Sequence, residues 1–136
     1  MLKLKRAYDP VSKEDDGTRF LVERLWPRGL SKAKLRVDAW LKDVGPSTAL
    51  RQWFSHDPEK WSQFCTRYFR ELDSHPEAWQ PILSAARRRR VTLVYSSRDE
   101  EHNNAVALKE YLHAKERERR LSLKSVASDR TPRASR

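Results

Sequence analysis

The sequence predicts a small three-layer α/β sandwich, with a short, mostly parallel sheet and helices on both faces. Short runs of apolar and β-branched residues at 2–6, 19–25 and 91–95 are typical of strands with at least one buried face. Between and after them, apolar residues recur at helical spacing. Parallel neighbours need crossover connections, and the helical segments can supply them.

The strands are expected in the following order. Leu and Lys alternate in the first strand, at 2–6, and a polar, turn-rich loop at 9–17 leads into the second, at 19–25. Pro27 and Gly29 end this second strand. Residues 35–44 fit both alternating and helical spacing, and we favour a strand. The clearest strand is Val-Thr-Leu-Val-Tyr at 91–95.

Helix start signals separate these strands. Residues 31–34 form a short capped turn, and three longer helices are expected to begin near Ser47, Asp57 and Pro76. Asp99 is the expected cap of the last helix, whose apolar stripe ends near residue 113. We therefore expect one domain at 1–114 and a basic, disordered tail at 115–136.

The net charge of +10 is unevenly distributed along the 136 residues. Residues 115–136 hold eight Lys or Arg and three Asp or Glu, a net of +5, which leaves +5 for the other 114 residues. An arginine cluster at the end of one helix supplies much of the remainder: Arg87, Arg88, Arg89 and Arg90. This distribution weakens the case for a broad phosphate-binding face. The cluster and tail nevertheless define an alternative, nucleic-acid binding or a regulatory role.

Several classes of site are excluded or disfavoured. The three glycines are far apart in sequence, which excludes a Rossmann fingerprint and a P-loop. The four histidines have no metal-ligand spacing, so no metal site is expected and the cofactor is unknown. Cys65, the only cysteine, is expected to be a packed thiol. Without a long apolar run or an apolar leader, the expected location is the cytoplasm, with no membrane partner.

Two strand exits carry the candidate binding residues. If the strands at 19–25 and 91–95 are parallel neighbours, their carboxyl ends meet at the edge where open α/β sheets bind ligands. Guanidinium groups, aromatic rings, hydroxyls and a helix start suit a phosphate- or carboxylate-bearing ligand. The candidates are Arg24, Trp26, Arg28, Ser47, Tyr95, Ser96, Asp99 and Asn103.

Within this set, Arg24 and Arg28 are the expected clamps, and Trp26 and Tyr95 the walls. Whether a reaction occurs is left open, with Asp99 as the candidate general base. The competing interpretation is that Arg24 pairs with Glu23 or Asp99 to stabilise the fold and that Trp26 is core. A further alternative is an interaction module with Trp-rich helices, present as a monomer or a homodimer.

The chain resembles the short YeaO-like branch of the domain-of-unknown-function family 488 over about residues 1–114. The most specific motif is Leu-Trp-Pro-Arg-Gly at 25–29. The resemblance also rests on Lys5–Asp9, Arg19–Gly29, Trp40–Val44 with Pro46 and Ser47, Trp53 and Phe54, Tyr95 and Ser96, and Asp99–Asn103. It implies a compact bacterial α/β domain and brings no established activity with it.

Longer members of this family carry a Cys at the end of the last strand and a Cys-His-Arg triplet in the turn beyond it. Here Tyr95 stands at the position of that Cys, and Asn103, Asn104 and Ala105 stand at the triplet. The resemblance therefore carries no thiol chemistry over to this chain.

Overall fold

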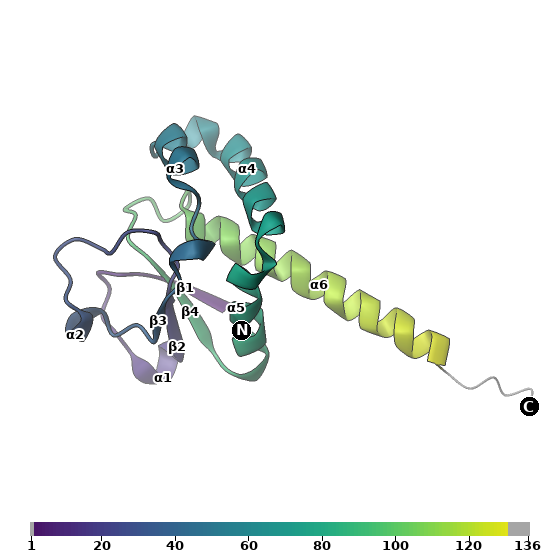
Figure 1. Ribbon diagram of the computed structural model, residues 1–136. Helices are drawn as coiled ribbons and strands as arrows, with labels where there is room; N and C mark the ends of the chain where they lie inside the picture. Colours follow the sequence, from purple (N-terminus) through teal and green to yellow (C-terminus); the bar gives the residue numbers. More distant parts are fainter. Residues whose placement is uncertain (1, 131–136) are drawn as a thin grey trace, which may run out of the picture.

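The computed structural model describes residues 2–130, which form a four-stranded sheet and a set of helices (Figure 1). The elements follow in the order β1 (Leu2–Arg6), α1 (Lys13–Asp16), β2 (Thr18–Leu21), α2 (Lys32–Leu35), β3 (Ala39–Trp40), η1 (Lys42–Val44), α3 (Thr48–Phe54), η2 (Pro58–Lys60), α4 (Trp61–Ser74), α5 (Pro76–Arg88), β4 (Val91–Tyr95) and α6 (Asn104–Arg130).

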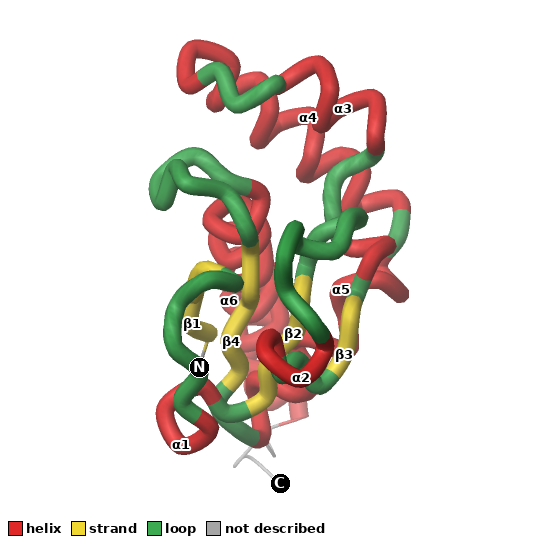
Figure 2. The backbone as a smooth tube through the Cα atoms, turned by 90° about the vertical axis from the view of Figure 1, so that its left-hand side faces the viewer, coloured by secondary structure: helices red, strands yellow, loops and turns green. Residues whose placement is uncertain are grey.

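All the strand pairs are parallel, as the sequence predicts, and the sheet order is β1-β4-β2-β3 (Figure 2). Strand β4 lies between β1 and β2, with Leu4 and Phe20 both in register with Leu93. The carboxyl ends of β2 and β4 are therefore adjacent. This is the geometry on which the predicted convergence of the two strand exits depends.

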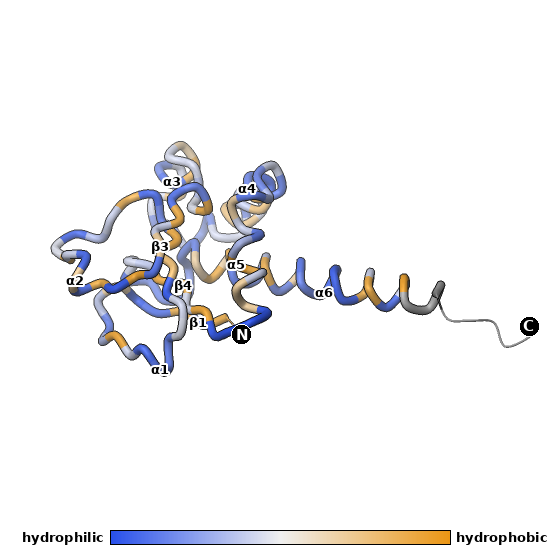
Figure 3. Tube along the Cα trace, turned by 60° about the horizontal axis from the view of Figure 1, so that its bottom comes forward, coloured by the Kyte–Doolittle hydropathy of each residue, from blue (hydrophilic) through white to orange (hydrophobic). Residues whose placement is uncertain are grey.

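The larger core lies on the face covered by the long helices. Val91, Leu93 and Tyr95 of β4 point to this face and pack with buried residues of α4, α5 and α6. The buried residues of these helices recur at the expected helical spacing. They include Phe64, Tyr68 and Leu72 of α4 and Ala105, Leu108, Tyr111 and Leu112 of α6. Figure 3 shows hydrophobic residues on the strands and, alternating with hydrophilic ones, along the helices.

The opposite face of the sheet has a thinner cover. Leu21 and Val94 pack there with Leu35 and Ala7, and with the partly buried Trp26 and Trp40. The cover consists of the loop that follows β2 and the single-turn helices α1 and α2, rather than long helices. The second helical layer of the predicted sandwich is thus reduced to short pieces, while the α/β class and the parallel sheet are confirmed.

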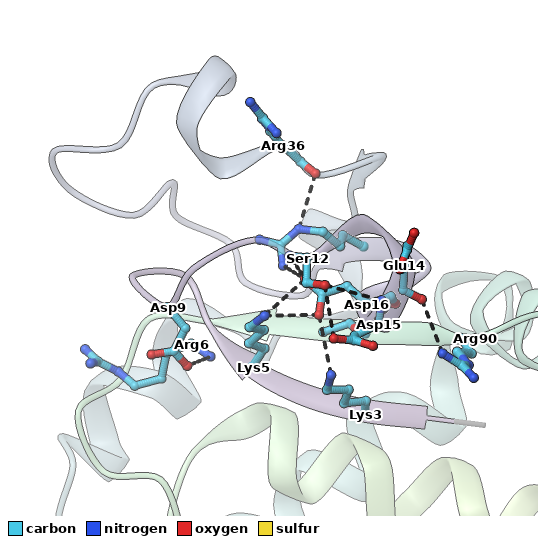
Figure 4. A network of polar contacts seen from close by, with 12 residues as sticks. Lys3, Lys5, Arg6, Asp9, Ser12, Glu14, Asp15, Asp16, Arg36 and Arg90 are labelled. Atoms are coloured by element: carbon cyan, nitrogen blue, oxygen red, sulfur yellow. Dashed lines mark hydrogen bonds and ion pairs between the residues drawn. The ribbon is translucent and has the colours of Figure 1, made fainter.

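A buried ionic network holds the amino end of the sheet together on this same face (Figure 4). Asp16 and Arg19 are fully buried, and Arg19 Nη1 donates to Asp16 Oδ2 at 2.8 Å. Lys5 Nζ donates to both oxygens of Asp16, at 3.1 and 3.3 Å. Arg19 also donates to the carbonyls of Leu35 and Arg36, which ties α2 to β2. The network therefore joins β1, α1, β2 and α2.

Two predicted strands are shorter than expected. β2 ends at Leu21, because β4 ends at Tyr95 and β3 at Trp40, so residues 23–25 have no strand beside them. The predicted strand at 35–44 is only β3 at 39–40. Leu35 belongs to α2 and Arg36 ends that helix with a left-handed φ of 50°, while a 3-10 turn begins at Lys42. The predicted loop at 9–17 contains α1, capped by Ser12.

Helix α6 continues to Arg130, through a stretch for which the sequence predicts disorder from residue 115. Its second half projects from the body of the molecule (Figure 1). Glu116 explains part of this difference, since it forms ion pairs with Arg87 of α5 and with Arg119 and Arg120 on its own helix. Lys115 similarly lies 3.7 Å from Asp73 of α4. Residues 131–136 of the predicted tail lie outside the described residues.

Candidate functional site

A pocket of about 330 Å³ lies where the chain leaves β2 and β4, and we call it the edge pocket. It draws residues from the β1 exit, the β2 exit, α3, α4 and the start of α6. The lining residues are Tyr8, Glu23, Arg24, Leu25, Trp26, Pro27, Arg28, Pro46, Arg51, Phe54, His56, Phe64, Ser96, Ser97, His102, Asn103 and Asn104. Five of the eight predicted ligand residues are therefore brought together: Arg24, Trp26, Arg28, Ser96 and Asn103.

Glu23 and Ser96 join the two strand exits within the pocket. The backbone N–H of Ser96 donates to Glu23 Oε1 at 2.7 Å, and its hydroxyl donates to Oε2 at 2.8 Å. Burial raises the pKa of the Glu23 carboxyl, and the two Ser96 bonds and the nearby charge of Arg51 oppose that rise. Both oxygens are thus held in one orientation by groups that belong to the fold.

Arg51 enters the pocket from α3. No described residue forms a hydrogen bond or an ion pair with its guanidinium, and its Nε is buried without an acceptor. Leu50 and Phe54 of the same helix are buried in the larger core, which anchors α3 beside the pocket. An unpartnered buried donor is costly, so this side chain is the clearest unsatisfied group in the pocket.

His56 follows α3 at the pocket wall with an unusual backbone. Ser55 and His56 have φ values of 46° and 56°, two consecutive left-handed residues that are not glycine. The His56 ring lies 6.4 Å from that of Phe54. Such backbone strain is often found at binding sites, where it fixes the direction of a side chain.

The predicted clamps and wall on the β2 side differ in their attachments. Arg24 Nε donates to the carbonyl of Pro46 at 2.7 Å, and Nη1 lies 3.9 Å from Asp43, so part of its guanidinium supports the fold. Arg28 is exposed, and its guanidinium has no hydrogen-bond or ion-pair partner among residues 2–130. Trp26 packs edge-on against Trp40 and donates to Leu30 O, so it is both partly core and pocket wall.

The turn before α6 orients a histidine that the sequence did not single out. Asp99 accepts from the backbone N–H groups of Glu101 and His102, and its Oδ2 lies 3.0 Å from His102 Nδ1. These backbone donors lower the pKa of Asp99, with His102 adding to the effect. His102 lines the edge pocket, whereas Asp99 does not. Asp99 is therefore placed to position His102.

The cap of α6 is Asn103 rather than Asp99. Asn103 Oδ1 accepts from Val106 N at 3.0 Å, and its Nδ2 donates to Asp99 O at 2.9 Å. The prediction that Asp99 caps the last helix is wrong, because Asp99 closes the preceding turn, four residues too early. Asn104 then donates to Val22 O at 2.7 Å, which fixes the start of the helix against β2.

Besides Asp99, two predicted residues lie outside the edge pocket. Tyr95 is buried in the larger core, because the last residue of β4 points to the face covered by α6. Ser47 caps α3 and bonds Glu71, and it lines a separate cavity of about 160 Å³ together with Arg24. Neither residue shares a pocket with the Arg28 guanidinium.

Sequence reasoning missed Glu23, Arg51, His56 and His102 as lining residues. A signal existed for Glu23, since an acid directly after the buried run at 20–22 marks a strand exit. Arg51 had a weaker signal, as the one charged residue between the apolar residues of α3. Nothing in the local pattern indicates His56, whose direction depends on two left-handed residues.

The basic cluster is partly neutralised within the protein. Arg87 forms an ion pair with Glu116, and Arg90 donates to the carbonyl of Glu14. Arg88 and Arg89 are exposed at the end of α5. Only part of the charge counted in the sequence is therefore available at this surface.

The remaining sequence expectations concern thiols, metals and membranes. Burial raises the pKa of the half-buried Cys65 to about 11, as befits a packed thiol. Among residues 2–130, no group of three His, Cys, Asp or Glu side chains is placed to hold a metal ion. Within the same range, no helix combines the length and the apolar character needed to cross a bilayer.

Fold and site define a small parallel α/β protein with a mixed aromatic and cationic pocket at the carboxyl edge of its sheet. The chain belongs to the family described as the inactive DUF488-N3 subclade, whose model matches residues 1–131. This match confirms the resemblance and extends it beyond residue 114.

The chain matches curated relatives over nearly the whole length of those proteins. Uncharacterized protein YeaO of Escherichia coli (strain K12) is 36% identical over 113 residues, which are 83% of this chain and 97% of that protein. Uncharacterized protein Rv3073c of Mycobacterium tuberculosis (strain ATCC 25618 / H37Rv) is 36% identical over 114 residues, 84% of this chain and 95% of that protein. No solved structure matches the chain significantly.

Proposed function

We propose that this protein binds a small ligand with a phosphate or carboxylate group in the edge pocket. The observation that carries the proposal is the guanidinium of Arg51, which lines the pocket without a hydrogen-bond partner among the described residues. A planar guanidinium matches the geometry of phosphate and carboxylate oxygens, and an anion there would satisfy it.

The charge of the pocket lining supports the same conclusion. Arg24, Arg28 and Arg51 face one acid, Glu23, whose oxygens already accept two hydrogen bonds. The aromatic residues around them exclude water and lower the local dielectric, which strengthens the attraction for an anion. Arg28 adds an exposed cation that an entering ligand would meet.

The proposal is for binding rather than catalysis. The family's description as inactive supports this choice. So does the engagement of Asp99, the candidate general base, by two backbone N–H groups and His102 outside the pocket lining. We also propose a cytoplasmic location, in keeping with a single, half-buried cysteine.

Thermal unfolding in the presence of anions tests the proposed function. Inorganic phosphate, phosphorylated metabolites and small carboxylates are added at constant ionic strength, with chloride as the reference. A ligand at a hundred times its Kd should raise the Tm by roughly 5–10 °C. Arg51→Gln should abolish the rise, and Arg28→Ala should reduce it.

The matched control is Arg88→Gln, an exposed arginine outside the edge pocket. It should retain the full Tm rise. If no anion stabilises the wild type, or if Arg88→Gln loses the response as fully as Arg51→Gln, the proposed function fails.

A second candidate is nucleic-acid binding through the end of α5 and the projecting half of α6. The observation in its favour is that Arg88, Arg89, Arg117 and Lys124 are exposed. Against it, Glu116 engages Arg87, Arg119 and Arg120.

A further inference from the structure

We propose that the ligand of the edge pocket is a guanine-type mononucleotide, a flat ring with two adjacent N–H donors joined to a phosphate. The phosphate part of this inference rests on the proposed function, and the new part is the identity of the ring. Three features support the ring: the free acceptor sites of Glu23, the aromatic side chains that reach the pocket from both faces of the sheet, and the left-handed backbone at His56.

Glu23 has spare capacity as a paired acceptor. An ionised carboxylate offers about four lone-pair sites on its two oxygens. Ser96 occupies one on each oxygen, through its N–H on Oε1 and its hydroxyl on Oε2. One site on each oxygen therefore remains, and because Glu23 lines the pocket, two parallel N–H donors of a ligand would match this arrangement. The N1–H and N2–H₂ edge of guanine presents such a pair.

The pocket takes aromatic side chains from both faces of the sheet. Phe54 belongs to the core on the helical face, and Trp26 packs with the core on the opposite face. Both line the pocket at the edge where the two faces meet. A flat ring that enters at this edge is contacted by aromatic groups from two directions, and a flexible aliphatic ligand would gain less from them.

His56 supplies a second reason to expect a flat ring. It is exposed, yet two successive left-handed residues hold it at the pocket wall. No hydrogen bond from the ring to a described residue accounts for this placement. A ring that stacks on a ligand base would account for it.

The arginines complete the match. With the base at Glu23, the phosphate of a mononucleotide would reach the guanidinium of Arg51 or Arg28, which line the same pocket. The volume of about 330 Å³ falls in the range of small-molecule sites. Glu23 would thus contact the end of the ligand that carries the N–H donors, and Arg51 the end that carries the phosphate.

Isothermal titration calorimetry of the wild-type protein with a series of five ligands tests the inference. The ligands are guanosine 5′-monophosphate, its N1-methylated form, adenosine 5′-monophosphate, ribose 5-phosphate and inorganic phosphate. Guanosine 5′-monophosphate should bind roughly tenfold or more tightly than any other member, because only it offers both donors with a phosphate. N1-methylation removes one donor and changes no other polar group, so it isolates the contact with Glu23.

Glu23→Gln provides the protein side of the test. The amide replaces one acceptor by a donor, so the preference for guanosine 5′-monophosphate over ribose 5-phosphate should fall to about threefold or less. The matched control is Glu100→Gln, an exposed residue of the neighbouring turn outside the pocket lining, which should keep the preference. If Glu23→Gln does not fold, the N1-methylated ligand on the wild type decides alone.

The outcomes separate the inference from the proposed function. If phosphate and ribose 5-phosphate bind as tightly as the nucleotide, the anion site stands and the inference is overturned. It is equally overturned if N1-methylation leaves affinity unchanged, or if folded Glu23→Gln keeps the guanine preference. If no member of the series binds, and no carboxylate does, both proposals fall.

Discussion

At the scale of single residues, two charged side chains lie wholly inside the protein. Asp16 and Arg19 are both fully buried, and each compensates the other within the network at the amino end of the sheet. Removing one member of such a pair leaves an uncompensated charge, which is far costlier than losing a surface ion pair.

Asp16→Asn is therefore expected to lower the free energy of unfolding by about 3 kcal/mol. Urea denaturation at pH 7 measures the change, and the neighbouring exposed Asp15→Asn serves as the control, with a change within about 0.5 kcal/mol. Equal effects of the two variants would contradict the role assigned to the network.

The same carboxylate predicts a pH dependence. Burial alone would raise the pKa of Asp16, but the N–H of Ser12 and the cations Lys5 and Arg19 win, so the pKa lies below its ordinary value. Because the folded pKa is lower than the unfolded one, the contribution to stability is present above about pH 4 and is lost in more acidic solution. Unfolding free energies from pH 5 to pH 2 should fall more steeply for the wild type than for Asp16→Asn.

Gly17 and Gly29 form a matched pair of glycines with positive φ, at 63° and 76°. A Cβ on Gly17 would lie 2.3 Å from the carbonyl oxygen of Arg90, whereas a Cβ on Gly29 would meet nothing within 4 Å. Gly29→Ala should therefore cost only the backbone strain, about 1 kcal/mol. Gly17→Ala should cost at least about 2 kcal/mol more in chemical denaturation, because the backbone before β4 must move. Similar costs would show that the turn adapts freely.

At the scale of elements, α6 has one firm end and one projecting end. Asn103 is nearly fully buried and uses both ends of its amide, one on Val106 N and the other on Asp99 O. The side chain thus links the turn that carries His102 to the first turn of the helix. Leu121, Leu123 and Val126, in contrast, are exposed on the projecting half.

Asn103→Ala is expected to reduce stability by about 1–2 kcal/mol through loss of the cap. Asn103→Ser keeps a side-chain oxygen that can accept from Val106 N and should recover part of that loss. Thermal or urea unfolding of both variants measures the effect. If the two substitutions destabilise equally, the cap bond is not the important contact of Asn103.

At the scale of the whole molecule, the sequence predicted the α/β class with a mostly parallel sheet, the strand at 91–95 and the meeting of two strand exits, whereas the central place of that strand comes from the structure. These features depend on local patterns, such as the apolar run at 91–95 and the exit at Pro27. The residues that line the pocket were predicted less completely than these features. Tyr95 and Ser47 point elsewhere because β4 and α3 each have two sides, and only tertiary packing decides which residue faces the pocket.

Helix α6 beyond residue 114 escaped prediction for a related reason. Its charged residues lack an apolar stripe, and the pairs of Glu116 with Arg87 and of Lys115 with Asp73 involve helices far away in sequence. Long-range ion pairs of this kind leave no periodic signal. The sequence pattern alone therefore resembles that of a disordered basic tail.

Truncation after Arg120 tests the nucleic-acid alternative without disturbing these ion pairs. The free energy of unfolding of the shortened chain should lie within about 0.5 kcal/mol of that of the full chain, since residues 121–126 are exposed. If the full chain binds DNA or RNA in a gel shift, its affinity should fall steeply with salt, and the truncation together with Arg88→Gln should weaken it. If neither chain binds nucleic acid at low salt, this alternative is removed. Gel filtration of both chains separately shows whether the protein is a monomer or a homodimer.

The central place of β4 has a consequence for biosynthesis. β1 and β2 both pair with β4, and the one strand pair formed without it, β2 with β3, spans two residues on each strand. Most of the sheet therefore cannot assemble on the ribosome until residue 95 has been synthesised, although β1 is made first. The nascent chain carries unpaired apolar strands for most of its translation, and folding must wait for contacts of high sequence separation.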